Sequence, residues 1–237
     1  MRMKRMAWGI TGGGQHLEQS VEAVFRLSRD NHVCSFVSRA AEEVLHMYGV
    51  FERVAEISGG EYLEELILES QTGLSFPETG RFMLGRVDVL LVAPATANTV
   101  AKMAWGIADS LVTNAVAMAN KSAVPVYVLP TDLEGQAQSR TPYSIDREIC
   151  RQCDPCPARE GCPQGAVNQQ IDLMRCDGCG TCASLCQYGA ISAVSLRVKT
   201  REIDRRNLDQ LRRFPGITVL DGPGDIEKIF QELAGAL

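Results

Sequence analysis

The sequence lacks any hydrophobic stretch long enough to cross a membrane. A membrane helix needs about 20 apolar residues in a row, whereas the longest apolar run, Val87–Ala97, already contains Asp88. The basic start, Met1–Met6, leads directly into a short apolar segment and a glycine turn, without the apolar region and cleavage site of a signal peptide. We therefore expect a cytoplasmic protein with no membrane partner.

The sequence also lacks a surplus of positive charge. Its 24 Lys and Arg residues are outnumbered by 29 Asp and Glu residues, for a net charge of −5. A nucleic-acid-binding domain normally carries a basic surplus, so we expect no nucleic-acid partner. Apolar residues make up 45% of the 237 positions and charged residues 22%, which is ordinary for a globular protein of one large or two smaller domains.

Cysteine, in contrast, is abundant and concentrated in one region. Eight of the nine cysteines form two CxxCxxC runs, each followed by a fourth cysteine after five residues in the first run and three in the second. Bacterial ferredoxins use the pattern C-x2-C-x2-C-x3-C-P to bind [4Fe–4S] clusters, and the fourth cysteine of each run serves the other cluster. Disulfide networks are typical of small secreted domains, and zinc sites use separated CxxC pairs. The spacing therefore favours two [4Fe–4S] clusters.

The ferredoxin pattern assigns the cysteines to two crossed sets of ligands. One cluster is predicted to be bound by Cys150, Cys153, Cys156 and Cys186, and the other by Cys176, Cys179, Cys182 and Cys162. The first run is two residues longer than the bacterial pattern and the second lacks its proline, which leaves the potentials, and a [3Fe–4S] variant, open. The ninth cysteine, Cys34, lies in a predicted buried strand, where we expect it to act as a small hydrophobic residue.

Outside the cysteine region, short apolar segments alternate with amphipathic ones. The predicted strands are Ala7–Thr11, Val33–Val37, Val87–Ala93 and Val124–Leu129, and the predicted helices are His16–Ser28, Arg39–Tyr48, Tyr62–Leu68, Asn98–Trp105 and Asp109–Asn120. This alternation is typical of an α/β fold with a Rossmann-like, doubly wound parallel sheet. Trp8 and Trp105 could border a flat ring, but core packing is the expectation for both.

The α/β pattern resumes after the cysteines, with a helix over Arg201–Arg213, a strand over Ile217–Leu220 and a helix over Asp225–Leu233. We therefore expect three segments: an α/β domain over residues 1–143, an inserted α+β ferredoxin-type module over residues 144–195, and a return to the first domain over residues 196–237.

Three loops follow predicted strands, at the edge of the sheet where open α/β folds bind ligands. They combine glycines, hydroxyls and an amide at helix starts, which together form a candidate phosphate-binding site. The candidate residues are Thr11, Gly12, Gly13, Gly14, Ser38, Arg39, Pro94, Ala95, Thr96, Asn98 and Thr99. Arg39 could compensate phosphate charge, with a solvated surface arginine as the alternative.

The third of these loops carries a family resemblance. The run Ala93–Lys102, continued by Gly106–Leu111, resembles the FMN-binding flavoprotein family that includes the cysteine decarboxylases, which share Pro-Ala-Ser-Ala-Asn-Thr and Gly-x-Ala-Asp-x-Leu segments. The resemblance implies that the three loops bind FMN. The decarboxylases also have a histidine before the third strand and a Pro-x-Met-Asn element after the next one. Residues 78–84 contain no histidine and no Met-Asn follows Val128, so we do not expect thiol decarboxylation.

The segment Leu129–Asp132 and the fused ferredoxin module resemble archaeal flavoproteins and dihydromethanopterin reductases of the acceptor type. That resemblance implies electron flow from an external low-potential donor, such as ferredoxin, through two [4Fe–4S] clusters to FMN. The electrons would then reduce dihydromethanopterin to tetrahydromethanopterin. It also implies a homotrimer or an assembly of trimers. No catalytic proton donor can be named. The alternative is a flavin and iron–sulfur electron carrier that serves other proteins and has no small-molecule substrate of its own.

Overall fold

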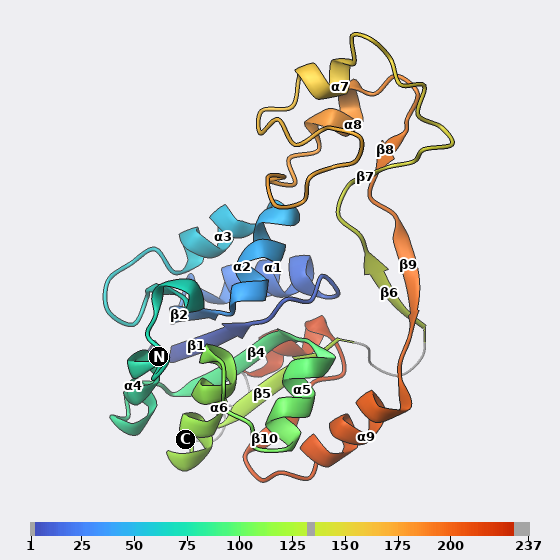
Figure 1. The fold of residues 1–237 in the computed structure, drawn as a ribbon. Coiled ribbons are helices and arrows are strands. Elements are labelled where there is room, and N and C mark those ends of the chain that lie inside the picture. The colour runs from blue at the N-terminus through green and yellow to red at the C-terminus, as the bar shows by residue number, and fades with distance from the viewer. Residues whose placement is uncertain (1–2, 132–135, 230–237) are drawn as a thin grey trace.

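A six-stranded parallel sheet forms the centre of the molecule, in a computed structural model that describes residues 3–131 and 136–229 (Figure 1). Its strands lie in the order β10-β5-β4-β1-β2-β3. They are β1 (Arg5–Ile10), β2 (His32–Val37), β3 (Leu66–Leu68), β4 (Val89–Ala95), β5 (Val126–Pro130) and β10 (Ile217–Val219). This is the doubly wound order of Rossmann-like folds, so the predicted fold class is confirmed.

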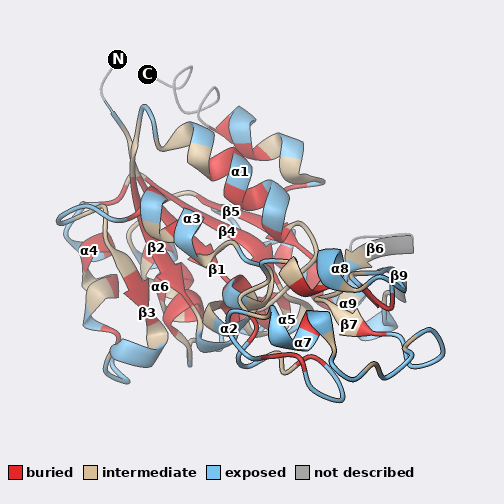
Figure 2. Ribbon diagram, turned by 90° about the horizontal axis from the view of Figure 1, so that it is seen from above, coloured by how far each residue is buried: buried red, intermediate tan, exposed pale blue. Residues whose placement is uncertain are grey.

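Helices cover both faces of the sheet. The helices are α1 (Leu17–Leu27), α2 (Arg39–Met47), α3 (Phe51–Ile57), α4 (Gly80–Met83), α5 (Ala97–Ala104), α6 (Leu111–Lys121) and α9 (Glu202–Leu211). Residues of α1, α2 and α3 share one hydrophobic core with one face of the sheet, and residues of α4, α5, α6 and α9 share the second core with the other face. Figure 2 shows these buried layers along the strands. Apolar burial on both faces explains why the central strands have almost no polar residues.

The two tryptophans occupy opposite environments. Trp8 is completely buried in β1, and its indole N–H donates a hydrogen bond of 2.8 Å to the carbonyl of Ala93 on the neighbouring strand β4. Trp105, which follows α5, is 72% exposed, with its indole N–H bonded to Asn207 of α9. The expectation of core packing is confirmed for Trp8 and wrong for Trp105.

The predicted helix over Tyr62–Leu68 is also wrong. Leu63 has a positive φ of 78°, outside the helical region, and its amide N–H donates to the Glu65 carboxylate. The residues that follow form strand β3, in which Leu66 pairs with Ser35 and Leu68 with Val37. The open edge of β2 therefore recruits this apolar segment into the sheet, because pairing satisfies the backbone groups of both strands.

The cysteine-rich segment stands away from the sheet, on a two-stranded antiparallel ribbon (Figure 1). The ribbon consists of β6 (Gln136–Arg140) and β9 (Ser195–Lys199), and beyond it lie β7 (Ser144–Ile145), α7 (Pro157–Glu160), α8 (Thr181–Leu185) and β8 (Ile191–Ser192). A separate small core holds this module together, with Ile145, Val167 and Ile191 among its buried residues. The predicted helix at Asp225–Leu233 runs partly outside the described residues; within them, a 3₁₀ turn at Pro223–Asp225 leads into helix at Ile226.

Candidate functional site

Strands β1 and β4 form the switch point of the sheet, where the strand order reverses. Ligands of doubly wound folds bind in the crevice beyond the carboxyl ends of such strands. Thr11, which follows β1, connects the two strand ends here: its hydroxyl donates to the carbonyl of Pro94 at 2.8 Å and accepts the amide N–H of Thr96 at 2.8 Å. Because Thr11 is only 3% exposed, these bonds are shielded from water and hold the two loops in a fixed relation.

The glycine loop after β1 is lined so closely that it has no space for side chains. A Cβ atom added to Gly13 would lie 2.8 Å from the Thr131 methyl and 3.4 Å from that of Thr96, and a Cβ at Gly14 would overlap the hydroxyl of Tyr48. The backbone is therefore bare at this point. Bare amide groups at the start of a helix are the usual means of binding a phosphate.

Three helices begin at this edge of the sheet. Helix α1 starts just after the glycine loop, at Leu17. Helix α2 is capped by Ser38, whose hydroxyl accepts the Ala41 N–H at 3.1 Å, and α5 by Thr96, which accepts the Thr99 N–H at 3.3 Å. Helix N-termini carry partial positive charge, so the edge is electrostatically suited to an anionic group.

The other predicted contact residues fall into two groups. Arg39 and Asn98 are exposed, whereas Pro94 and Ala95 are buried at the end of strand β4. The latter two contribute backbone carbonyls: that of Pro94 binds Thr11, and that of Ala95 accepts the amide N–H of Thr131 at 2.8 Å. Arg39 lines a surface cavity of about 470 Å³ between α2 and the cysteine module, together with Leu173 and Met174.

Two residues at this edge were not among the predicted contact residues, although Thr131 lies in the segment Leu129–Asp132 that carries a family resemblance. Thr131 directly follows β5 and lies against Gly13, and Tyr48 ends α2 and lies against Gly14. The position of Thr131 just after a predicted strand was an available signal. That of Tyr48 was not, because it depends on how α2 packs beside the glycine loop.

The first predicted set of cluster ligands lines one cavity. Cys150, Cys153, Cys156 and Cys186 all border a space of about 370 Å³ inside the module. The fourth of these comes from the end of α8, more than 30 residues after the first. The crossed spacing of the sequence thus corresponds to four thiols around a common space.

The second set also gathers. Burial first, and then the neighbouring thiols of Cys162 and Cys176, raise the pKa of Cys182. Burial and then the Asp177 carboxylate raise the pKa of Cys176, and the neighbouring thiols of Cys179 and Cys162 raise it further. Backbone amides point at these sulfurs: Gly178 N–H lies 3.4 Å from the Cys176 Sγ, and Ala166 N–H lies 3.3 Å from the Cys162 Sγ. Such hydrogen bonds tune the potential of an iron–sulfur cluster.

All nine cysteines lie in the described ranges and are free thiols. Within these ranges, no three or more His, Cys, Asp or Glu side chains converge closely enough to hold one metal ion.

Cys34 belongs to neither set and is buried in β2, as expected. Burial raises its pKa to about 12. Its sulfur contacts the guanidinium of Arg81 at 3.1 Å, and the same group binds Glu65 at 2.9 Å. The thiol is therefore protonated at neutral pH and belongs to a packed polar cluster beneath β3.

Among the helices of residues 3–131 and 136–229, none has the length and apolar character needed to span a bilayer.

Comparison with known proteins agrees with this geometry. Residues 1–134 match the Flavoprotein family and residues 170–192 match the 4Fe-4S binding domain. A dihydromethanopterin reductase (acceptor) of Methanosarcina mazei is 49% identical over 97% of this chain and 100% of its own length. Another of the same name, from Methanocaldococcus jannaschii, is 42% identical over 95% of each chain.

A solved structure shares the fold over nearly the whole chain. DmrB of Burkholderia xenovorans, determined in complex with FMN and described as a cubic protein cage for redox transfer, superimposes with a TM-score of 0.65 at 25% identity, covering 98% of this chain and 96% of its own. The chain therefore belongs to the flavoprotein family, within the group that includes the dihydromethanopterin reductases (acceptor), and it carries a 4Fe–4S binding domain in its C-terminal part.

Proposed function

We propose that this chain is an iron–sulfur flavoprotein reductase that reduces dihydromethanopterin to tetrahydromethanopterin with electrons from an external low-potential donor. One observation carries the proposal: a flavoprotein-family domain whose switch-point loops lead into three helices and a cysteine module with two sets of four thiols occur in one chain. The names of the two relatives that match over nearly their full length supply the substrate.

FMN is the cofactor that suits the crevice. The loop Gly12–Gly14, which has no side chains of its own, and the capped helix starts at Ser38 and Thr96 would hold its phosphate, since they offer amide donors and partial positive charge. The related DmrB structure contains FMN. Bound there, FMN would take electrons singly from iron–sulfur clusters and deliver them in pairs to an organic acceptor. The protein's own part is to position the ring and exclude water.

Two [4Fe–4S] clusters would complete the redox chain. The first would use Cys150, Cys153, Cys156 and Cys186, and the second Cys162, Cys176, Cys179 and Cys182. The family match covers residues 170–192, and so one of the two cysteine runs. The proposal of a second cluster, outside this match, rests on the run Cys150–Cys156, whose thiols border a common cavity with Cys186.

We also propose that the chain assembles into a homo-oligomer built from trimers. The support is the related DmrB structure, described as a cubic cage. In such an assembly, neighbouring chains would contribute to the flavin crevice.

An anaerobic assay tests the substrate. The FMN-loaded and cluster-loaded protein is mixed with a reduced low-potential donor and dihydromethanopterin, and tetrahydromethanopterin is measured by chromatography. The proposal expects tetrahydromethanopterin in proportion to the donor oxidised, two electrons per product. Oxidation of the reduced protein by another redox protein, with no product and no change in the flavin spectrum on adding the pterin, would instead identify an electron carrier.

A further inference from the structure

The two sets of cysteines occupy different positions relative to the flavoprotein domain. Every residue that lines the cavity of Cys150 lies between positions 145 and 191, inside the module. Cys176, in contrast, lines a cavity of about 530 Å³ that it shares with His46, Gly49 and Phe51 of the α2–α3 region. We call the Cys150 set the outer site and the Cys176 set the inner site.

The loop of the inner site packs directly on the flavoprotein domain. A Cβ atom added to Gly178 would lie 2.5 Å from the backbone nitrogen of Gly49 and 2.7 Å from the carbonyl oxygen of Met47, so the two backbones touch. Gly178 stands between Cys176 and Cys179 in the sequence. The thiols of the inner site are therefore held on a loop that is seated on the turn after α2.

The same turn reaches the glycine loop of the candidate flavin site. Tyr48 precedes Gly49, lies over Gly14 and donates its hydroxyl to the carbonyl of Arg140, at the end of β6. Arg140 is held in turn by Glu18 of α1 at 2.7 Å. A continuous path of packed groups thus runs from the inner cysteine loop through Tyr48 to the glycine loop.

The outer site faces solvent with a positive rim. Three exposed arginines, Arg147, Arg151 and Arg159, line its cavity against one carboxylate, Asp154. The exposed carboxylates Asp146, Glu148 and Glu160 are next to these arginines in the chain but do not line the cavity. The chain as a whole carries a net charge of −5, so this rim opposes the overall charge. A positive patch of this kind attracts an acidic partner and orients it during encounter.

We propose that the two sites work in a fixed order, with the outer site receiving electrons from an acidic one-electron donor protein and the inner site passing them to the flavin across the Gly49–Gly178 contact. The order rests on the proposed function. In each transfer the donor would lose one electron, which would pass to the cluster held by the outer site, then to the cluster held by the inner site, and finally to FMN. Two such transfers, with two protons from water, reduce one FMN fully.

Two cluster variants test the order in the full-length, FMN-loaded protein. A chemically reduced acidic ferredoxin serves as donor, flavin absorbance follows the acceptor, and electron paramagnetic resonance identifies the reduced cluster. In Cys179→Ser the outer cluster should become reduced while the flavin stays oxidised. In Cys153→Ser the ferredoxin should reduce neither remaining cofactor at the original rate, whereas dithionite reduces both. Flavin reduction at the original rate in Cys179→Ser would overturn the proposal.

A glycine pair tests the contact with every cysteine in place. Gly49 and Gly85 have similar positive φ values of 69° and 63°, but a Cβ at Gly49 would lie 3.1 Å from the Asp177 carbonyl, and one at Gly85 meets nothing within 4 Å. Gly49→Ala should slow flavin reduction several-fold, because the added methyl group pushes the two backbones apart and electron transfer slows as the distance between the cofactors grows. Gly85→Ala should leave the rate unchanged.

Iron and FMN contents should equal those of the original protein in both glycine variants. Equal rates of flavin reduction in Gly49→Ala and Gly85→Ala would contradict transfer across this contact. Dihydromethanopterin is absent from these assays, so their outcome is independent of whether the substrate assignment is correct.

Discussion

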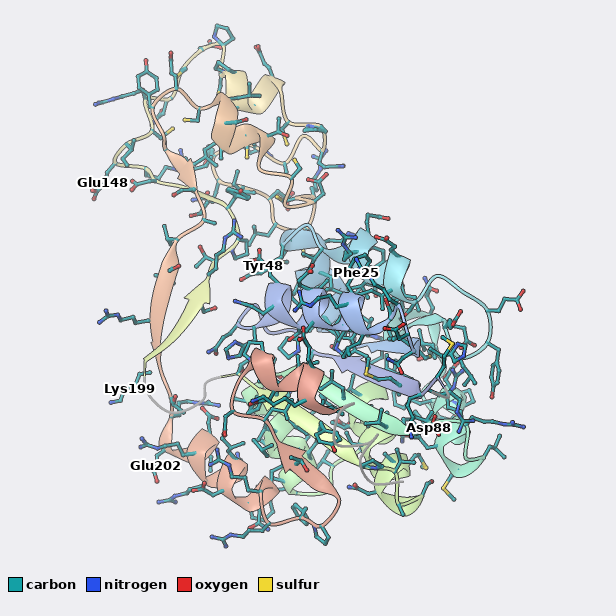
Figure 3. The ribbon with its side chains drawn as sticks, turned by 180° about the vertical axis from the view of Figure 1, so that it is seen from behind. Phe25, Tyr48, Asp88, Glu148, Lys199 and Glu202 are labelled. Atoms are coloured by element: carbon teal, nitrogen blue, oxygen red, sulfur yellow. The ribbon has the colours of Figure 1, made fainter. Side chains whose placement is uncertain are left out.

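The ring of Tyr48 lies over Gly14, so the residue that ends helix α2 touches the glycine loop that follows β1. Figure 3 labels Tyr48 where the α/β domain meets the module. Partial burial, and then the Glu18 carboxylate, raise the pKa of its phenol, which therefore remains a hydrogen-bond donor to Arg140 at neutral pH. A single side chain thus links the candidate flavin site and the ribbon that leads to the cysteines.

Gly14→Ala should weaken FMN binding without loss of iron. The added methyl group would overlap the Tyr48 hydroxyl, so either the tyrosine or the loop must move and the amide donors lose their alignment. The measurement is FMN retained after gel filtration, with affinity from quenching of flavin fluorescence. Gly80→Ala is the control, because a Cβ there meets nothing within 4 Å. Equal flavin affinity in the two variants would contradict this role of the loop.

Thr11→Val should destabilise the protein and lower its flavin affinity. The valine keeps the shape of threonine but leaves the Thr96 N–H without its acceptor and removes one donor to the Pro94 carbonyl. An unsatisfied buried group costs about 1–3 kcal/mol, measurable by urea denaturation. Thr218→Val in β10 is a matched control, because Thr218 is exposed. A destabilisation no larger than that of the control would refute the proposed tie between the two loops.

The crossed assignment of cysteines predicts which variants resemble each other. Cys186→Ser should lose the same cluster as Cys153→Ser, and Cys162→Ser the same cluster as Cys179→Ser, each with about four irons fewer per chain. Iron analysis and the resonance spectrum of the remaining cluster provide the comparison. If Cys162→Ser instead matched Cys153→Ser, each run would bind its own cluster and the crossed arrangement would be wrong.

The Glu65 carboxylate should make the stability of the folded protein sensitive to acid. Burial opposes its ionisation, but hydrogen bonds from Arg81 and from the Leu63 amide outweigh this, so its pKa lies below the usual 4.5. Its contribution to stability is therefore complete above about pH 4.5 and is lost as the pH falls through the lowered pKa of the folded state.

Glu65→Gln should consequently be less stable at neutral pH, by about 1–3 kcal/mol, and should lose less stability on acidification than the original protein. Urea midpoints over an acid series measure both effects. Glu61→Gln, an exposed neighbour in the same loop, controls for loss of clusters in acid. An unchanged acid slope in Glu65→Gln would exclude this carboxylate as the source.

The elements that could be predicted from the sequence are those whose pattern is local. The buried strands around Trp8 and Leu91 and the cap at Ser38 were recognisable because hydrophobic period and capping chemistry are properties of neighbouring residues. Strand β3 was not, because its apolar residues also fit a helical stripe and the open edge of β2 decides between the two. Helix α3 was missed, being only seven residues long.

The candidate site also has features that could be predicted from the sequence and features that could not. The glycine loop and the Thr96 loop could be found because each carries its own signal, and the switch point of the sheet then brings them together. Tyr48 and the Gly49–Gly178 contact could not, since they arise from the seating of the module on α2. Which cysteine set faces the flavoprotein domain is likewise a property of tertiary packing alone.

The most direct test of the account is the cofactor content of the purified protein, prepared without oxygen. Iron, acid-labile sulfide, zinc and FMN are counted per chain on the same sample. Two cubane clusters and one flavin predict about eight irons, about eight sulfides and about one FMN, with zinc absent. Zinc in place of iron, or iron without any FMN, would contradict the assignment of this chain as an iron–sulfur flavoprotein.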